Sequence, residues 1–201
     1  RPPQPRRPAP APPPPVPGRA SRPRIAPTGV ERPFADGEII VSKTDLTGHI
    51  TYVNDVFLRV SDFTRAELIG APHSVIRHPD MPRAVFDLLW TELKAGREVF
   101  AYIVNLAKNG DHYWVYAHVT PTFDAGGRVL GYHSNRRTVN RRALPTVQAL
   151  YAELRAQEQA VEQGRAGHDT SKRAGLAAST AHLTRHLATL GQSYDEYVWS
   201  L

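Results

Sequence analysis

A repeated alternation in the second half of this 201-residue chain constrains its fold more than any other feature. Apolar and polar residues alternate through residues 98–107 and again through 111–123, and Asn109-Gly110 lies between the two runs. Asn-Gly is the strongest short signal for a two-residue hairpin turn. A glycine pair then separates the second run from a third at about residues 128–138. This pattern predicts a meander of three antiparallel strands.

Two further strands are predicted earlier in the chain. The stretch EIIVSKTDLTGHITYVN, which starts at residue 38, contains two short β-branched runs broken by Thr47-Gly48. Three short helical pieces follow, and then a longer helix at about residues 82–95. Asp80 suits the N-cap of that helix, and Gly96 suits the residue after its end. Two strands, short helices and a three-stranded meander together predict an α+β fold, with a five-stranded antiparallel sheet and helices on one face.

The chain past residue 140 has a helical period again. Leucines and valines at spacings of three and four predict two helices that pair as an antiparallel hairpin. In the final segment SYDEYVWSL, Ser193 and Glu196 have the spacing of a capping box. A short last helix would place Tyr194, Tyr197 and Val198 on one face, and we expect that face to dock a partner.

Composition divides the chain into three parts. Residues 1–33 hold 13 of the 18 prolines and seven arginines with a single acid, so we expect residues 1–35 to form a disordered arm. Residues 36–142 carry the strand and helix pattern of a sensor domain, and residues 143–201 form a helical extension for signalling or partner docking. The arm accounts for the net charge of +6. The rest is neutral, which argues against a nucleic-acid partner.

The sequence also restricts compartment and chemistry. It holds no apolar run long enough to span a membrane and no signal-peptide core, so we expect a cytoplasmic protein. The absence of cysteine removes thiolate chemistry and disulfides. There is no glycine-rich phosphate loop, no nucleophile elbow and no room after residue 145 for a kinase domain. We therefore expect a protein that is not an enzyme.

One segment carries a family resemblance. Within YVNDVFLRVSDFTRAELIGAPH, the pattern Y-x-N-x-x-F and the following F-T-x-x-E-L-x-G resemble a PAS domain, although Asp62 stands where glycine is common. The continuations RHPDMP and KNGDHYWV narrow the resemblance to the PAS domain of aerotaxis receptors. This resemblance covers about residues 38–145 and leaves out the arm and the C-terminal helices.

The resemblance implies a redox sensor that binds FAD and reports respiratory state to chemotaxis signalling. The sequence shows no membrane anchor and no signalling coiled coil after the domain. It therefore resembles a stand-alone PAS protein, and we expect a chemoreceptor or another signalling protein to act as its partner in trans. A homodimer is a further expectation.

The resemblance associates three residues of the RHPD segment with FAD retention. These are Arg77, His78 and Asp80. A guanidinium and an imidazole both donate well to phosphate or ribose oxygens. Asp80 could instead accept from Arg77 or cap the helix, and His78 before Pro79 could simply close the preceding helix.

Five other residues complete the predicted cofactor site. Asn54 either contacts the ligand or caps the helix that follows it. Trp90 and Phe57 are either pocket walls or ordinary core. Asn105 and Asn135 lie on meander strands, where an amide could respond to the flavin edge and strain the sheet. Of Tyr113 and Trp114, only one can point inward, because neighbouring side chains on a strand alternate.

Other functions stay open. Blue-light sensing through a flavin adduct needs a cysteine, which this chain lacks. Haem b needs only an axial histidine, and the candidates are His73, His78, His112, His118 and His133. A cofactor-free interaction module is a third reading. His182 and His186 could chelate zinc with His168, but an exposed polar helix face is the simpler explanation, so no metal site is predicted.

Overall fold

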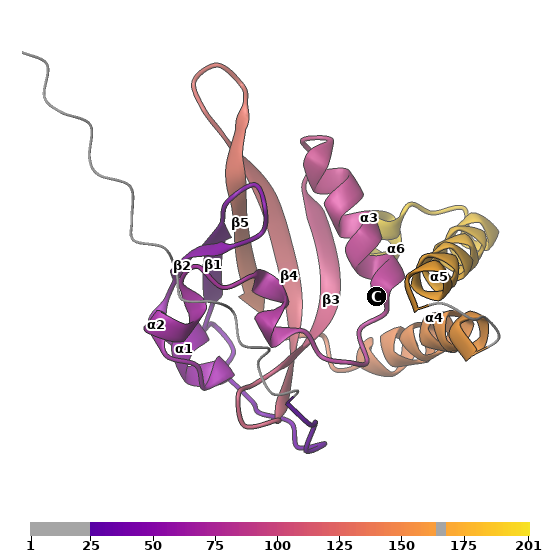
Figure 1. The fold of residues 1–201 in the computed structure, drawn as a ribbon, viewed down its shortest axis with the longest axis horizontal. Coiled ribbons are helices and arrows are strands. Elements are labelled where there is room, and N and C mark those ends of the chain that lie inside the picture. Colours follow the sequence, from indigo (N-terminus) through magenta and orange to yellow (C-terminus); the bar gives the residue numbers. More distant parts are fainter. Residues whose placement is uncertain (1–24, 164–167) are drawn as a thin grey trace, which may run out of the picture.

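The computed structural model describes residues 25–163 and 168–201, with side chains at 168 and 169 left aside. Its centre is a five-stranded antiparallel sheet with the strand order β2-β1-β5-β4-β3 (Figure 1). The strands are β1 (Ile40–Thr44), β2 (Ile50–Val53), β3 (Val99–Leu106), β4 (His112–Phe123) and β5 (Val129–Arg137). Both predicted hairpins and the meander are confirmed.

Short helices follow β2 and cover one face of the sheet, which we call the inner face. They are α1 (Asp55–Ser61), α2 (Arg65–Leu68), the 3₁₀ helix η1 (His73–Ile76) and α3 (Arg83–Lys94). The chain then ends in α4 (Leu144–Gln163), α5 (His168–Leu190) and α6 (Tyr194–Ser200). Helices α4 and α5 pack along each other as the expected hairpin (Figure 1). Among the described helices, none is both long and apolar enough to cross a membrane.

The start of α3 differs from the prediction. Asp80 does not cap this helix: Pro82 is the N-cap residue and makes no side-chain hydrogen bond. The carboxylate of Glu158, on α4, instead accepts from the backbone N–H of Arg83 at 2.7 Å and of Ala84 at 3.3 Å. The Asp80 carboxylate pairs with Arg155 of α4. A cap from 75 residues away replaces the local one, and local sequence rules cannot foresee it.

The C-terminal helices protect the open edge of β3. The Tyr151 hydroxyl of α4 donates to the Tyr102 carbonyl at 2.6 Å, and the Phe100 N–H donates to the Asp195 carboxylate at 3.2 Å. An edge strand with free backbone groups invites pairing with another chain. Here side chains of the same chain satisfy those groups, so α4 and α6 belong to the folded unit.

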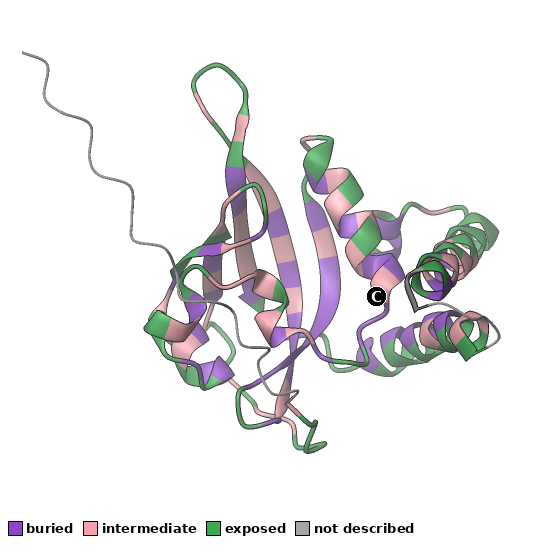
Figure 2. Ribbon diagram, viewed as in Figure 1, coloured by how far each residue is buried: buried purple, intermediate pink, exposed green. Residues whose placement is uncertain are grey.

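The prediction that α6 presents an exposed face to a partner is wrong. The capping box of Ser193 and Glu196 forms as predicted, but Tyr194, Tyr197 and Val198 are only 6%, 6% and 3% exposed. Helix α6 packs on β3, so these side chains stabilise the chain itself. Trp199 is the large residue of this helix that stays exposed, at 59%. Figure 2 shows which residues of the sheet and of the helices around it are buried, intermediate or exposed.

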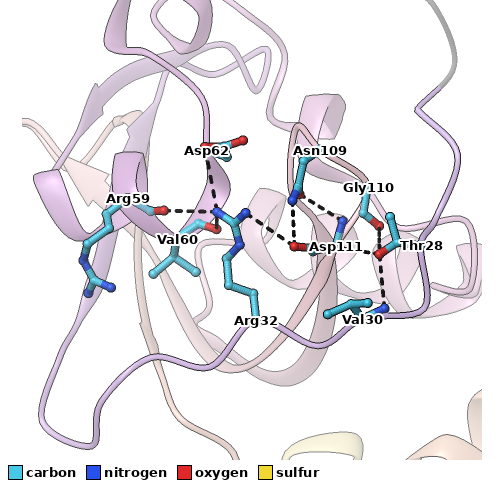
Figure 3. A network of polar contacts seen from close by, with 9 residues as sticks. All are labelled: Thr28, Val30, Arg32, Arg59, Val60, Asp62, Asn109, Gly110 and Asp111. Atoms are coloured by element: carbon cyan, nitrogen blue, oxygen red, sulfur yellow. Dashed lines mark hydrogen bonds and ion pairs between the residues drawn. The ribbon is translucent and has the colours of Figure 1, made fainter.

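The folded part starts earlier than composition predicted. Residues 25–35, assigned to the disordered arm, lie along the β3–β4 turn, and residues 1–24 are outside the described part. Thr28 donates its backbone N–H to the Gly110 carbonyl at 2.8 Å and its hydroxyl to Asp111 at 2.7 Å (Figure 3). Arg32 contacts Asp111 and, through the Val60 carbonyl, the end of α1. These polar contacts hold the segment together with Ile25 and Phe34, which pack against the hydrophobic core.

Candidate ligand pocket

A cavity of about 530 Å³ lies between the inner face of the sheet and the helices η1 and α3. This volume is within the usual range for small-molecule sites. Its walls are mainly apolar: Ile76, Phe86, Leu89, Trp90, Leu93 and Ile103. Polar and charged side chains also line the space, and their hydrogen-bond partners define what the cavity can hold.

Arg136 on β5 is the most informative of these polar residues. It is 1% exposed, and its guanidinium lies 4.5 Å from the Phe57 ring. One guanidinium nitrogen, Nη2, donates to Ser42 Oγ, while Nε and Nη1 have no hydrogen-bond partner. Burial lowers the pKa of Arg136 to about 10, so it stays charged at neutral pH. A buried cation with two unpaired donors calls for an acceptor from outside the chain.

Asn105 on β3 provides a second unpaired donor. The residue is 4% exposed and lines the cavity, and its amide nitrogen Nδ2 has no partner. The Asn105 backbone forms an isolated bridge to Arg77, which ties the loop before α3 to the sheet. Among the described residues, three side chains of the cavity lining therefore carry unpaired donors: Arg136 on β5, Asn105 on β3 and the Thr44 hydroxyl on β1.

Arg77 and Trp90 also line the cavity. The Arg77 guanidinium lies 4.6 Å from the Phe86 ring and donates to the Met81 carbonyl at 3.2 Å. Burial lowers the pKa of Arg77, although it remains a cation. Trp90 packs edge-on against the ring of Tyr132, with 5.3 Å between ring centroids. Both residues are thus placed where a bound ligand would touch them.

The other predicted residues lie outside the lining. His78 is buried behind the loop and accepts from the Asp80 N–H at 3.1 Å. Asn54 uses its side chain to cap α1 and to hold the backbone of β1. Phe57 lies beneath the guanidinium of Arg136. The prediction that Asn135 faces the pocket is wrong: it lies next to Arg136, on the outer face, and accepts from a histidine at 3.0 Å.

One of the five candidate haem ligands lines the cavity and the others do not. His73 lines the cavity, and its Nε2 lies 3.2 Å from Ser42 Oγ. Burial, with a smaller contribution from the Arg136 charge, lowers the pKa of His73 to about 3. His118 and His133 lie on the outer face, and neither they nor His78 and His112 line the cavity. One imidazole therefore reaches the pocket.

Sequence reasoning missed Arg136 and Ser42, and it named His73 only as a possible haem ligand. The strand around residues 128–138 was predicted, but which of its side chains point to the inner face was not. Asn135 and Arg136 are adjacent polar residues, and they lie on opposite faces. Ser134 and Tyr132, two and four residues before Arg136, share its face. That run of inward polar groups was the available signal. Tyr113, rather than Trp114, points inward, while Trp114 packs near Tyr151.

The C-terminal hairpin contributes to this site. Leu176 of α5 is part of the cavity lining. Arg83, at the mouth, pairs with Glu158 at 3.0 Å and with Glu162 of the same helix. Gly175 lets α5 approach, because a Cβ there would lie 2.9 Å from the Glu158 carbonyl oxygen. The wall of the cavity is thus built from two parts of the chain.

Comparison with known proteins agrees with this architecture. Residues 50–136 match the PAS fold family. The chain is 43% identical over 124 residues to the aerotaxis receptor of Escherichia coli, which covers 62% of this chain and 24% of the receptor. It is 33% identical over 88 residues to a biofilm dispersion protein of Pseudomonas aeruginosa, covering 42% and 21%. A nitrogen fixation regulatory protein of Klebsiella pneumoniae is 24% identical over 102 residues, covering 51% and 21%.

The chain thus spans between a fifth and a quarter of the length of these relatives. The family match at residues 50–136 takes in β2, the helices from α1 to α3, β3, β4 and most of β5, which carry most of the cavity lining. Residues 50–136 therefore form a PAS domain, similar to the matching region of the aerotaxis receptor.

Proposed function

We propose that this PAS domain is a sensor that binds a flavin, FAD, in the cavity and reports redox or respiratory state to a chemotaxis receptor in trans. The similarity to an aerotaxis receptor supports a sensing role and a signalling partner. The same similarity favours a cytoplasmic sensor that is not an enzyme. The choice of ligand rests on the cavity itself.

The buried, partly unpaired guanidinium of Arg136 carries the proposal. Leaving a buried donor unsatisfied costs about 1–3 kcal/mol, and more when the group is charged. The pyrimidine edge of a flavin presents two carbonyl oxygens and ring nitrogens that accept hydrogen bonds. Arg136 on β5 and the amide of Asn105 on β3 are donors on the sheet wall of the cavity, with β4 between their strands. The apolar side chains of the other walls suit the dimethylbenzene edge.

A bound flavin would supply reversible one- or two-electron chemistry at its ring. The residues of this chain bind and orient it. Arg136 holds positive charge against the acceptor edge, Asn105 donates from its amide, and Trp90 limits the width of the slot. Arg77 keeps its charge at the side of the cavity nearest α3.

The structure also offers a relay from the cavity to the C-terminal hairpin. Asn105 is joined to Arg77 by a backbone bridge, and the loop after Arg77 leads into the first turn of α3. That turn is capped by Glu158 of α4. We propose that a changed hydrogen bond at Asn105 shifts this loop and thereby the hairpin, which a receptor then reads.

The rival readings are less well supported by the cavity. For haem, the one imidazole that reaches the space, His73, already lies beside Ser42 and the Arg136 cation. A cofactor-free module would leave the donors of Arg136 unsatisfied with no gain to offset their cost. A ligand with several acceptors accounts for both observations.

The test is flavin binding by the wild type and by Arg136→Met. Wild-type protein purified from cells should be yellow, with a flavin band near ~450 nm. Replacing a buried cation by an apolar side chain is often neutral or stabilising, so R136M should keep its fold and its melting temperature. Its affinity for added flavin should fall at least about tenfold, because a charge-assisted hydrogen bond is lost.

Arg137→Met is the matched control, because Arg137 is the next residue of the same strand and is exposed on the outer face. It should bind flavin like the wild type. Equal affinities for R136M and R137M would reject the role of Arg136. A colourless wild type that takes up no added flavin, or one with a Soret band, would reject the flavin itself.

A further inference from the structure

The outer face of the sheet carries a row of packed aromatic rings where β3 and β4 pair. The ring of Phe100, on β3, is parallel to that of His118, on β4, with 4.2 Å between their centroids. The Trp199 indole of α6 packs edge-on against the same Phe100 ring at 5.4 Å. Tyr116 lies further along β4, with its ring centroid 6.0 Å from that of Phe100. We call these four residues the aromatic ladder.

The aromatic ladder is open to solvent although its surface is largely apolar. Trp199 is 59% exposed, which makes it the most exposed large apolar side chain among the described residues. Phe100, Tyr116 and His118 are half-buried. Contiguous exposed aromatic surface is typical of a binding site rather than of a core. The ladder therefore calls for an occupant that presents apolar groups to aromatic rings.

Carboxylates gather at one end of the ladder. Asp195 accepts from the backbone N–H of Phe100 at 3.2 Å. Burial raises the pKa of Asp195, and the nearby carboxylates of Glu92 and Glu98 add to this rise. Three acidic side chains thus lie close enough to one another to interact.

The cations around these carboxylates also have to be counted. Arg97 pairs with Glu92, and His118 lies 2.7 Å from the Glu98 carboxylate. Arg137 is opposite Tyr116 in the sheet, which places it toward the other end of the ladder. With one adjacent arginine for three carboxylates, the end near Glu98 is negative and favours a cationic occupant.

Residues 1–24, which precede the described part, have the composition that this surface requires. They hold 11 of the 18 prolines, six arginines and no acid. Residues 25–201 are neutral, with 19 basic and 19 acidic residues, so the excess positive charge of this chain lies in the arm. Proline-rich segments bind aromatic surfaces as polyproline II, because proline already restricts the backbone and little entropy is lost on binding.

The arm is also long enough. Thr28 is bonded to the β3–β4 turn, and Phe100 lies six residues before the end of β3, about 20 Å at about 3.3 Å per residue. The chain from Pro12 to Ile25 spans about 40 Å as polyproline II, at about 3.1 Å per residue. The proline run 12–15 can therefore reach the aromatic ladder, with the preceding residues left to continue toward the carboxylates.

We propose that residues 1–24 dock on the aromatic ladder of their own chain. Prolines 12–15 pack against the rings of Trp199 and Phe100. Arg6 and Arg7 then lie beside the carboxylates at the Glu98 end. This contact is independent of any ligand in the cavity, which opens on the inner face of the sheet.

A spin label in the arm tests the contact in the full chain. The chain has no cysteine, so Ala11→Cys carries a single nitroxide next to the proline run. NMR then reads the broadening of the three tryptophan indole signals. Within one chain the effective concentration of the arm is on the order of 1 mM, so the Trp199 signal should lose at least about half of its intensity. The signal of Trp90, which lines the cavity, should lose less.

Charge reversals within the arm provide the variant and its matched control. R6E/R7E should restore most of the Trp199 signal, because the carboxylates would then repel the arm. R22E/R24E changes the net charge equally but lies outside the contact, so it should keep the broadening. Equal Trp199 signals in the two double variants, or no broadening with the unaltered arginines, would overturn the docking. Broadening that appears only when label and isotope are on different chains would also overturn it, because a second copy would then supply the arm.

Discussion

Some buried side chains in this domain are unfavourable for folding but well suited to binding a ligand. Arg136 has one protein partner, Ser42, for its three guanidinium nitrogens, and it lies over Phe57 at the centre of the domain. Stability alone would favour an apolar residue at such a position. Its retention as a cation makes sense if the free energy is recovered on binding an acceptor.

His78 allows a prediction about pH. Burial, followed by the nearby His112 and Arg155, lowers its pKa to about 4, and its Nδ1 accepts from the Asp80 N–H, which requires the neutral ring. In the unfolded chain the pKa is about 6.5. Between these values the unfolded state binds a proton that the native state does not. The free energy of unfolding should therefore fall as pH drops from about 6.5 toward 4, by up to about 1.4 kcal/mol per pH unit.

Urea denaturation at pH 7 and pH 5 measures this effect. The difference in unfolding free energy between the two pH values should be smaller in His78→Gln by about 2 kcal/mol, because that variant has no imidazole to protonate at this position. The comparison is of differences, so any packing change that is independent of pH cancels. An H78Q variant with the same pH dependence as the wild type would contradict the assignment. His73 contributes in the same direction and should leave part of the slope in place.

Among the elements, α3 depends most on residues far away in sequence. Its first turn is capped by Glu158, which also pairs with Arg83 and accepts from the Ser179 hydroxyl at 2.9 Å. Three helices, α3, α4 and α5, thus meet at one carboxylate that is only 7% exposed. Helix α3 forms one side of the ligand cavity, so this carboxylate connects the cavity with the hairpin.

Glu158→Gln should destabilise the protein by about 3 kcal/mol, because Arg83 would lose its buried anionic partner while the side chain keeps its size. Chemical denaturation gives the magnitude. Hydrogen exchange should show faster opening at the start of α3. Glu153→Gln on the same helix is the control: its side chain is 58% exposed and, among the described residues, forms an ion pair with His182 alone, so the variant should change stability by less than about 1 kcal/mol. Equal effects of E158Q and E153Q would show that Glu158 does not hold the helices together.

The elements also show how far the sequence leads. All five strands, the capping box at Ser193 and the Asn109-Gly110 turn follow from local rules, because each depends on residues a few positions apart. Of the residues predicted for the cofactor site, Arg77, Trp90 and Asn105 line the cavity. The true cap of α3, the inward position of Arg136 and the burial of α6 depend on contacts across the fold. Periodicity does not determine such contacts.

At the scale of the whole molecule, the PAS domain is enclosed by segments from both ends of the described chain. Helices α4 and α6 satisfy the edge of β3, and residues 25–35 lie along the β3–β4 turn (Figure 3). The C-terminal helices therefore contact the free edge of β3, and the N-terminal segment contacts the turn that joins β3 to β4. Removing either contact should change the stability of the domain without touching the cavity.

Gly110 provides a sharp test of the N-terminal contact. Its φ of +97° disfavours any other residue, and a Cβ there would lie 2.3 Å from the Ala26 carbonyl oxygen. Gly127, in the β4–β5 turn, has a φ of +79° but no atom within 4 Å of a Cβ. Both Gly→Ala variants should lose about 1–2 kcal/mol from the left-handed backbone. G110A should lose about 1–3 kcal/mol more, because Ala26 and the hydrogen bonds of Thr28 would be displaced.

Chemical denaturation of the two variants isolates that difference, and limited proteolysis locates it. In G110A, residues 25–35 should become accessible to protease while the sheet remains protected, whereas G127A should keep this segment protected. Flavin affinity should be the same in both, since neither glycine lines the cavity. If G110A and G127A were equally stable and equally resistant, the N-terminal segment would contribute nothing to the fold, and its polar contacts would be no stronger than those it makes with water.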